Sequence, residues 1–221
     1  MDSTRNREII LNRLKRFAIR PEKPVKSELV KTKKDDTDTL YENFAQGVTA
    51  AGGSVFRVKD KDEALKTLDT ILTEAKVGTA KVSEDNMIRS MKIKAYLKGK
   101  DIKILAPGKD RSSHKKACFS ADAGITGTDY ALADTGTIVI RHGKDNARLP
   151  SLAPPVHIAF VEKSTLLPDI DTLVAEIKPS NKNMPSAMTL ITGPSMTADI
   201  ALQPTFGMHG PKNLYVIFIG K

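Results

Sequence analysis

Three segments rich in glycine, serine and threonine carry the side chains best suited to holding a small anion. They are GITGTDYALADTGT at residues 124–137, RLPSLAPPVH at residues 148–157 and ITGPSMTAD at residues 191–199. Each adjoins a run of apolar residues that is typical of a strand buried on both faces. Ligands of open parallel sheets bind beyond the carboxyl ends of the strands, so these segments are candidate parts of one binding site.

The segment ITGPSMTAD has the pattern of a strand, a glycine turn and the start of a helix. Gly193 would turn the chain into the helix, and Ser195 or Thr197 would be its N-cap. The first N–H groups of a helix lack intrahelical partners, so a helix start of this kind can bind an anion. The same hydroxyl groups could instead serve only as helix caps. No GKS or GKT follows the glycine, which excludes a Walker loop.

The candidate proton carriers are one aspartate and one histidine. Asp129 lies in the first segment beside a short predicted helix, where a carboxylate could act as a base or cap the helix. Asp134 follows five residues later, so the two carboxylates do not share a helix face and do not indicate paired-carboxylate catalysis. His209 lies in the turn GMHGP, which is an exposed setting suited to a site. His157 lies in an apolar run that is typical of a core histidine.

Residues that bind metals are too few and too scattered for a redox centre. Cys118 is the only cysteine, and the four histidines show no HExxH spacing. One thiol cannot hold an iron–sulfur cluster or a structural zinc ion, so we expect no cofactor in this chain. Lys115 and Lys116 could lower the pKa of the Cys118 thiol, although a lone thiol beside an apolar residue is more often inert.

The composition favours a protein of the cytoplasm. A single cysteine cannot form an internal disulfide, which fits a reducing compartment. No run of about 18 apolar residues is present, so we expect no membrane span. The first 17 residues lack the apolar stretch and the cleavage site of a secretory signal.

The net charge of +9 comes from the first half of the chain. Residues 1–116 contain 27 basic and 17 acidic side chains, whereas residues 117–221 contain 8 and 9. Such a basic region could bind nucleic acid, a membrane surface or an acidic partner. Nucleic-acid surfaces also need aromatic side chains for stacking, and only Phe17 and Tyr41 lie near the basic N-terminal segment. A solvated helix and linker is therefore the favoured interpretation.

Alternating helical and apolar patterns predict an α/β fold with a mostly parallel sheet in three α/β/α layers. Residues 1–39 are expected to form an amphipathic helix and a basic linker, and residues 40–221 the α/β domain. The predicted helices span residues 4–17, 40–51, 60–76 and 84–98. The predicted strands span residues 54–58, 77–82, 102–106, 137–141, 156–161, 188–192 and 214–220.

Three blocks together resemble the lactate utilization protein C family, also called the LUD-domain family. They are GITGTDYALADTGTIVI, RLPSLAPPVHIAFVEKSTLLPDI and ITGPSMTADIALQPTFGMHGPKNLYVIFIG, in the family's order and spacing. The resemblance implies a fold related to the NagB/RpiA/CoA-transferase group. The positions that match the family's motifs are Thr126, Gly127, Asp129, Thr135, Gly136, Arg148, Pro155, His157, Gly193, Ser195, Thr197, Asp199, His209 and Gly210.

The resemblance also implies a role in the oxidation of L-lactate to pyruvate, together with iron–sulfur partner proteins. The chain would then be a non-redox subunit that binds a small carboxylate or another anion. The alternative is a stand-alone enzyme that acts on a sugar phosphate or a related anionic metabolite. Fold alone does not decide between the two.

The expected anion site joins the three segments. Thr126, Gly127, Thr135 and Gly136 would supply its loops, and Gly193, Ser195 and Thr197 its helix start. Arg148 would add a planar clamp for a carboxylate. Asp129 is ranked ahead of His209 as the proton carrier.

We predict that the purified protein is colourless and free of iron, because one cysteine and scattered histidines offer no cluster ligands. Iron and acid-labile sulfide would be assayed on the isolated chain. Stoichiometric sulfide would contradict the prediction.

Overall fold

The computed structural model describes residues 7, 8, 12, 36–106, 110–143, 146–177, 185–198 and 204–220. The chain divides into two units, Met1–Lys31 and Thr32–Lys221. In the first unit only Arg7, Glu8 and Asn12 are described, and they are helical. The rest of the predicted helix 4–17 and most of the predicted linker 18–39 lie outside the described residues.

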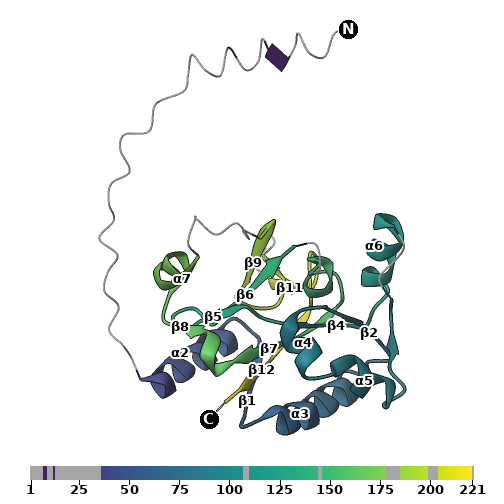
Figure 1. The fold of residues 1–221 in the computed structure, drawn as a ribbon, viewed down its shortest axis with the longest axis horizontal. Helices are drawn as coiled ribbons and strands as arrows, with labels where there is room; N and C mark the ends of the chain where they lie inside the picture. Colours follow the sequence, from purple (N-terminus) through teal and green to yellow (C-terminus); the bar gives the residue numbers. More distant parts are fainter. Residues whose placement is uncertain are drawn as a thin grey trace. The chain divides into compact units, whose positions relative to one another are not determined.

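A six-stranded sheet, parallel throughout, forms the centre of the second unit (Figure 1). Its strand order is β1-β12-β7-β4-β2-β3. The strands are β1 (Ser54–Val58), β2 (Thr79–Val82), β3 (Lys103–Ile104), β4 (Ala123–Gly127), β7 (Val156–Glu162) and β12 (Asn213–Ile219). The predicted α/β fold with a mostly parallel sheet is therefore confirmed.

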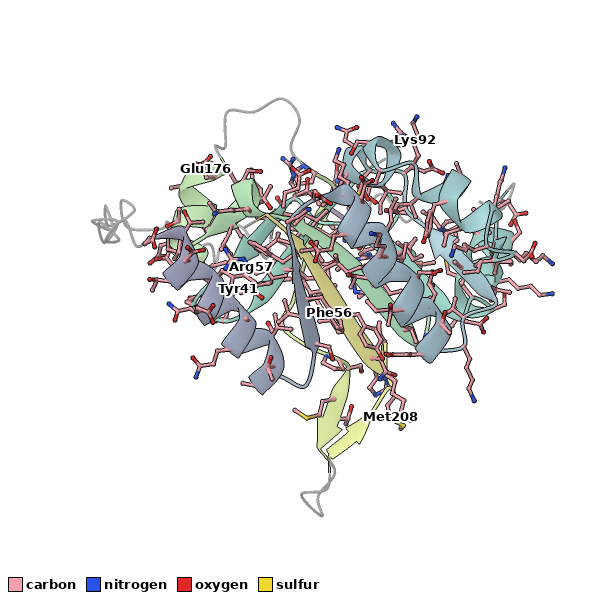
Figure 2. All side chains as sticks on the ribbon, turned by 90° about the horizontal axis from the view of Figure 1, so that it is seen from below. Tyr41, Phe56, Arg57, Lys92, Glu176 and Met208 are labelled. Atoms are coloured by element: carbon pink, nitrogen blue, oxygen red, sulfur yellow. The ribbon has the colours of Figure 1, made fainter. Side chains whose placement is uncertain are left out.

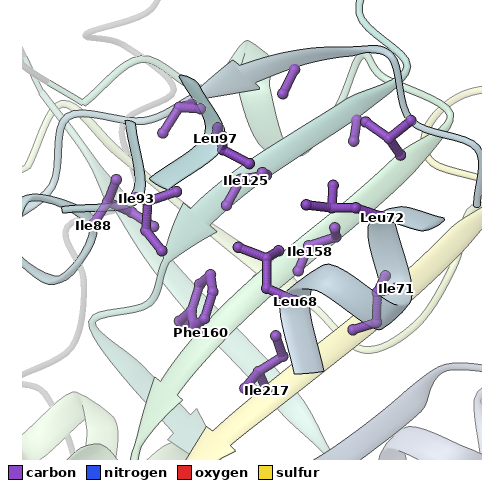
Figure 3. Close-up of a cluster of buried hydrophobic side chains, with 14 of the residues drawn as sticks. Leu68, Ile71, Leu72, Ile88, Ile93, Leu97, Ile125, Ile158, Phe160 and Ile217 are labelled. Atoms are coloured by element: carbon purple, nitrogen blue, oxygen red, sulfur yellow. The ribbon is translucent and has the colours of Figure 1, made fainter. Parts of the chain in front are cut away.

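One face of this sheet packs against the helices α3 (Lys61–Glu74), α4 (Asn86–Ser90) and α5 (Ile93–Lys98). Figure 3 shows this core, in which Leu68 of α3 lies above Ile158 and Phe160 of β7. Because side chains alternate along a strand, Ala159 and Val161 of β7 belong to the other face. The strand β7 is therefore buried on both sides, as its unbroken apolar sequence predicts.

The other face is covered by helix α2 (Thr37–Ala50) and by a second sheet. Phe44 and Val48 of α2 pack with Phe218 of β12, and neither is exposed. The guanidinium of Arg57 lies 4.4 Å from the centre of the Tyr41 ring and so ties β1 to α2 (Figure 2). Helix α2 begins at Thr37, so it includes three residues that were assigned to the linker.

The second sheet corrects two strand assignments. Its order is β8-β5-β6-β9, from β5 (Tyr130–Leu132), β6 (Thr137–His142), β8 (Leu166–Leu167) and β9 (Ala187–Ile191). The runs 137–141 and 188–192 form β6 and β9, which pair antiparallel here and do not join the parallel sheet. Met188 and Leu190 on β9 are partly exposed, because β9 is an edge strand covered on one face.

The segment 124–137 contributes strands to both sheets and does not form a helix between loops. Its first residues belong to β4, which is buried along its whole length, and β5 follows. Gly124 is necessary in β4, because a Cβ there would overlap the carbonyl oxygen of Pro150. The small side chains that suggest a loop therefore permit close packing in the centre of the sheet.

Two predicted helices differ from the structure. The residues after Ser195 form strand β10 (Met196–Ala198), which pairs antiparallel with β11 (Pro204–Phe206). No helix therefore starts at Ser195, and the N–H groups of residues 196–198 follow a strand geometry. The helix predicted at 84–98 is two short helices, because Lys92 has a left-handed φ of 53° between α4 and α5.

The remaining described elements are two helices and two 3-10 helices, of which η2 spans Lys163–Thr165. Helix α6 (Arg111–Phe119) begins with a capping box made by Asp110 and Ser113, and helix α7 (Ile170–Glu176) begins at an Asp169 cap. The 3-10 helix η1 (Leu149–Ser151) contacts β4 and α6. Among the described residues, no helix has the length and apolar character needed to cross a bilayer.

We predict that Gly124→Ala destabilises the fold by about 3 kcal/mol or more, at the upper end of the overpacking range, because the obstructing atom is backbone. The matched control is Gly143→Ala, since no atom of the described residues lies within 4 Å of a Cβ at Gly143. Urea unfolding would be compared for the two variants and the parent chain. Equal midpoints for both variants would contradict the packing of β4 against η1.

Candidate functional site

The order in which the chain adds strands to the parallel sheet reverses between β2 and β4. From β2 the chain passes outward to β3, and from β4 it passes the other way to β7. Open α/β sheets bind their ligands in the crevice outside such a switch point. A cleft with a volume of about 580 Å³ lies at this position.

Asp85 joins the ends of both strands. One oxygen of its carboxylate accepts the N–H of Ile88 at 3.0 Å and caps α4, and the other accepts the N–H of Gly127 at 2.9 Å. The hydroxyl of Ser83 donates to the same carboxylate. A Cβ at Gly127 would collide with Asp85, which explains the glycine at the end of β4. Gly127 therefore lies in the cleft, but its N–H is already used.

Asp129 and Arg141 form the charged wall of the cleft. The two oxygens of Asp129 accept the backbone N–H and the Nε–H of Arg141, both at 2.8 Å. The carboxylate of Asp129 therefore orients a guanidinium and is not a free base in this conformation. The ring of Tyr130 lies 5.7 Å from the guanidinium carbon of Arg141. The Nη groups of Arg141 have no hydrogen-bond partner within the described part of the chain.

His142 adds a buried imidazole to the same cleft. It is 4% exposed, and its Nε2 lies 2.7 Å from the hydroxyl oxygen of Thr189. Its Nδ1 makes no hydrogen bond to the described residues. Burial lowers the pKa of His142, and the charge of Arg148 lowers it further, whereas Asn146 and Asp129 oppose these effects. At neutral pH the cleft therefore holds an uncharged imidazole.

The cleft combines two guanidinium groups with carboxylates that already have partners. Glu84 accepts from Lys94 and lies 4.0 Å from Nε of Arg89. The described lining comprises Glu84, Asp85, Asn86, Met87, Arg89, Gly127, Thr128, Asp129, Arg141, His142, Gly143, Asn146 and Pro185. An anion that entered would meet the donors of Arg89 and Arg141, while the carboxylates are held by their own donors.

The other residues predicted for the site are not brought to this cleft. Thr126 is buried in β4, and its hydroxyl oxygen lies 2.9 Å from Nε2 of His157. His157 is fully buried in β7, which agrees with its interpretation as a core histidine. Arg148 is exposed and precedes η1; its charge affects His142, but it does not line the cleft.

Ser195 and His209 lie at the other end of the central strands, away from the cleft. Ser195 donates its N–H to the Pro211 carbonyl at 2.8 Å, and its hydroxyl oxygen lies 3.3 Å from the His209 N–H. These residues precede β12, so they lie at the amino ends of the strands. Figure 2 shows Met208 and Lys92 near opposite ends of the central strands. The structure therefore does not bring His209 and Asp129 together.

Three of the remaining predicted positions pack against or near α2. Gly136 has a left-handed φ of 65°, and a Cβ there would overlap the backbone of α2. A Cβ at Gly193 would lie 2.7 Å from the carbonyl oxygen of Ala51. The hydroxyl of Thr135 bonds that of Thr137 at 2.8 Å. These residues support the contact between the second sheet and α2 and do not face the cleft.

The last predicted positions lie at the amino edge or beyond the described residues. Thr197 lies in β10 opposite Thr205 of β11. The carbonyl of Pro155 accepts the N–H of Lys212 at 2.7 Å, before the start of β12. A Cβ at Gly210 would lie 3.2 Å from the Cβ of Ser195. Asp199 lies outside the described residues.

Sequence reasoning missed Asp85, Arg141 and His142 as parts of the site. Asp85 lies three residues after the end of β2, and Arg141 and His142 end β6. The strand TIVIR was predicted at residues 137–141, but neither Arg141 at its end nor His142 after it was considered as a site residue. Within the described ranges, no group of three or more His, Cys, Asp or Glu side chains could hold a metal ion.

The fold and the cleft define an α/β protein with a cleft at the switch point of its parallel sheet, and comparisons with known proteins identify its family. A sequence model of the LUD domain matches residues 41–219. A lactate utilization protein C from Halalkalibacterium halodurans is 29% identical over 195 residues, which cover 87% of this chain and 84% of the relative. One from Anoxybacillus flavithermus is 30% identical over 156 residues, 70% of each chain. The chain therefore belongs to the LUD-domain family.

A solved structure supports the fold. The crystal structure of a DUF162 family protein from Deinococcus radiodurans superposes with a TM-score of 0.59 and is 20% identical. The match covers 84% of this chain and 99% of that protein. At this identity the likeness concerns the fold alone.

We predict that His157 makes the protein less stable in mild acid. Complete burial lowers the pKa of His157 to about 3. The unfolded chain gains a proton on His157 near pH 6.5, and the folded chain does not. The stability that the neutral His157 contributes is therefore fully present above pH 6.5 and is lost as the pH falls toward 3. The free energy of unfolding should fall by about 1.4 kcal/mol per pH unit in this window from His157 alone.

Urea unfolding at several pH values would test this with His157→Gln, which keeps a polar group for Thr126 but does not titrate. The variant should lose part of the acid dependence, whereas His209→Gln at an exposed position should keep it. An unchanged slope in His157→Gln would contradict the prediction.

Proposed function

We propose that this protein is a component of a lactate-utilization system and that the switch-point cleft binds a small carboxylate. The observation that carries the proposal is the guanidinium of Arg141, fixed by Asp129 at the cleft, in a chain whose relatives are named lactate utilization protein C. A guanidinium with free Nη groups matches the planar geometry of a carboxylate.

The remaining groups suit a 2-hydroxy or 2-oxo acid. Arg89 adds a second cation, and the cleft is also lined by the imidazole of His142, whose buried Nδ1 has no hydrogen-bond partner among the described residues. A neutral imidazole can donate to or accept from a hydroxyl or carbonyl oxygen. In this arrangement Asp129 is a positioning residue for Arg141, and His142 replaces His209 as the candidate proton carrier.

The redox chemistry is proposed to take place with partner proteins. Conversion of L-lactate to pyruvate removes two electrons and two protons, so an electron acceptor is required. We propose that iron–sulfur proteins of the same system supply it and that this chain is the non-redox subunit. The system would operate in the cytoplasm, for which the free, buried thiol of Cys118 is suitable. A relationship of the fold to the NagB/RpiA/CoA-transferase group is proposed on the resemblance alone.

We predict that Arg141→Met lowers the affinity for L-lactate and pyruvate at least tenfold, because a charge-assisted pair contributes about 1.5–3 kcal/mol. Arg141→Lys should bind with intermediate affinity, since it keeps the positive charge and loses the planar pair of N–H donors that can bind both oxygens of a carboxylate. Isothermal calorimetry on the full chain would measure both. The control is Lys66→Met on the exposed side of α3.

The proposal fails if the parent chain binds neither acid or if Arg141→Met binds both as the parent does. The role in the cell is tested separately, by deleting the gene in its host and measuring growth on L-lactate. Complementation by the parent chain and not by Arg141→Met would support the site and the role together. Normal growth of the deletion strain would contradict the role.

A further inference from the structure

A buried lysine without an acidic partner lies beside a second pocket. Lys81 in β2 is 3% exposed, although lysine is almost never fully buried unless it is paired. Its Nζ donates to the carbonyl of Leu105 at 3.0 Å. No carboxylate lies within 4.0 Å of it among the described residues. Two of the three ammonium donors are therefore left without a described protein acceptor.

Strand alternation directs this side chain away from the large core. Ala80 and Val82 belong to the core under α3, so Lys81 faces the opposite side of the sheet. On that side its charge acts on His114 and Cys118 of α6. A pocket of about 370 Å³ is bordered there by Lys81, His114 and Pro150.

The lining of this pocket combines cationic side chains with apolar ones. Lys81, Arg89 and Lys94 face a single carboxylate, Glu84, which already accepts from Lys94. Burial lowers the pKa of Lys81 and the charge of Lys94 lowers it further, whereas Cys118 and Glu84 oppose these effects. The apolar part of the described lining comprises Val82, Ile104, Leu105, Ala147 and Pro150.

We propose that this pocket binds an organic anion with an apolar body, its carboxylate or phosphate head on Lys81. The apolar body would lie against Ile104 and Leu105. A bound anion would supply a counter-charge in direct contact with Lys81, which no carboxylate of the described residues does. This pocket is distinct from the switch-point cleft, but Glu84 and Arg89 line both. The two ligands would therefore lie next to each other.

The test uses phenyl phosphate, phenylacetate and uncharged benzyl alcohol as probes in calorimetry on the full chain. At least one anionic probe should bind and benzyl alcohol should not; the tighter of the two anions identifies the head group. Lys81→Met, which keeps the apolar stem, should lower the affinity at least tenfold. Lys103→Met on the adjacent strand β3 is exposed and should bind as the parent does.

A second variant distinguishes anion binding by Lys81 from a purely structural role of this residue. Ala147→Glu changes an exposed residue of the lining and should weaken anion binding by repulsion without altering the thermal midpoint. Lys81→Met should keep or raise the midpoint, because it removes a buried charge that has no acidic partner. Lactate binding in the first cleft should be unchanged in Lys81→Met, which separates this proposal from the proposed function.

The proposal is overturned if no anionic probe binds or if benzyl alcohol binds as tightly as the anions. It is also overturned if Lys81→Met or Ala147→Glu binds the anions as the parent does. A strongly lowered midpoint in Lys81→Met, with unchanged affinity in Ala147→Glu, would assign Lys81 to the fold alone.

Discussion

The carboxylate of Asp85 holds together the three elements around which both pockets form. It accepts from Ser83 after β2, from Gly127 at the end of β4 and from Ile88 at the start of α4. Each such charge-assisted bond contributes about 1.5–3 kcal/mol, and its loss would leave buried donors unsatisfied. The neighbouring Glu84 lines both pockets, so the position of Asp85 also fixes the border between them.

The sequence predicts the central fold because both faces of the parallel sheet are apolar. The strands β7 and β12 lie where largely apolar runs predict them, β1 lies where SVFRV predicts a strand, and the helix α3 lies between β1 and β2. The second sheet could not be predicted in this way, since TIVIR is also continuously apolar and packs on α2 from one side and α7 from the other. Local sequence indicates a buried strand, and only tertiary contacts decide which sheet it joins.

The candidate site was only partly predictable because glycines have two uses. Gly127 and Asp129 do lie at the cleft, where backbone and carboxylate approach closely. Gly124, Gly136 and Gly193 instead make room for the backbone of η1, α2 and Ala51. A glycine-rich sequence is the same whether the close neighbour is a phosphate or another peptide, so spacing alone could not separate the two.

Whether a charged group already has a hydrogen-bond partner in the protein, more than its residue type, decides whether it can bind a ligand in one of the two pockets. Sequence reasoning looked for a free carboxylate and selected Asp129, but Asp129 is held by Arg141, as Glu84 is by Lys94. Within the described residues, the groups with donors that lack a partner are cations: the Nη atoms of Arg141 in one pocket and the ammonium of Lys81 in the other. Spare donors next to occupied carboxylates attract anions and repel metal ions, because the negative charge is already neutralised and the positive charge is not. The burial of Lys81 strengthens this preference, since a charge in a low-dielectric wall interacts more strongly with a ligand than one in water.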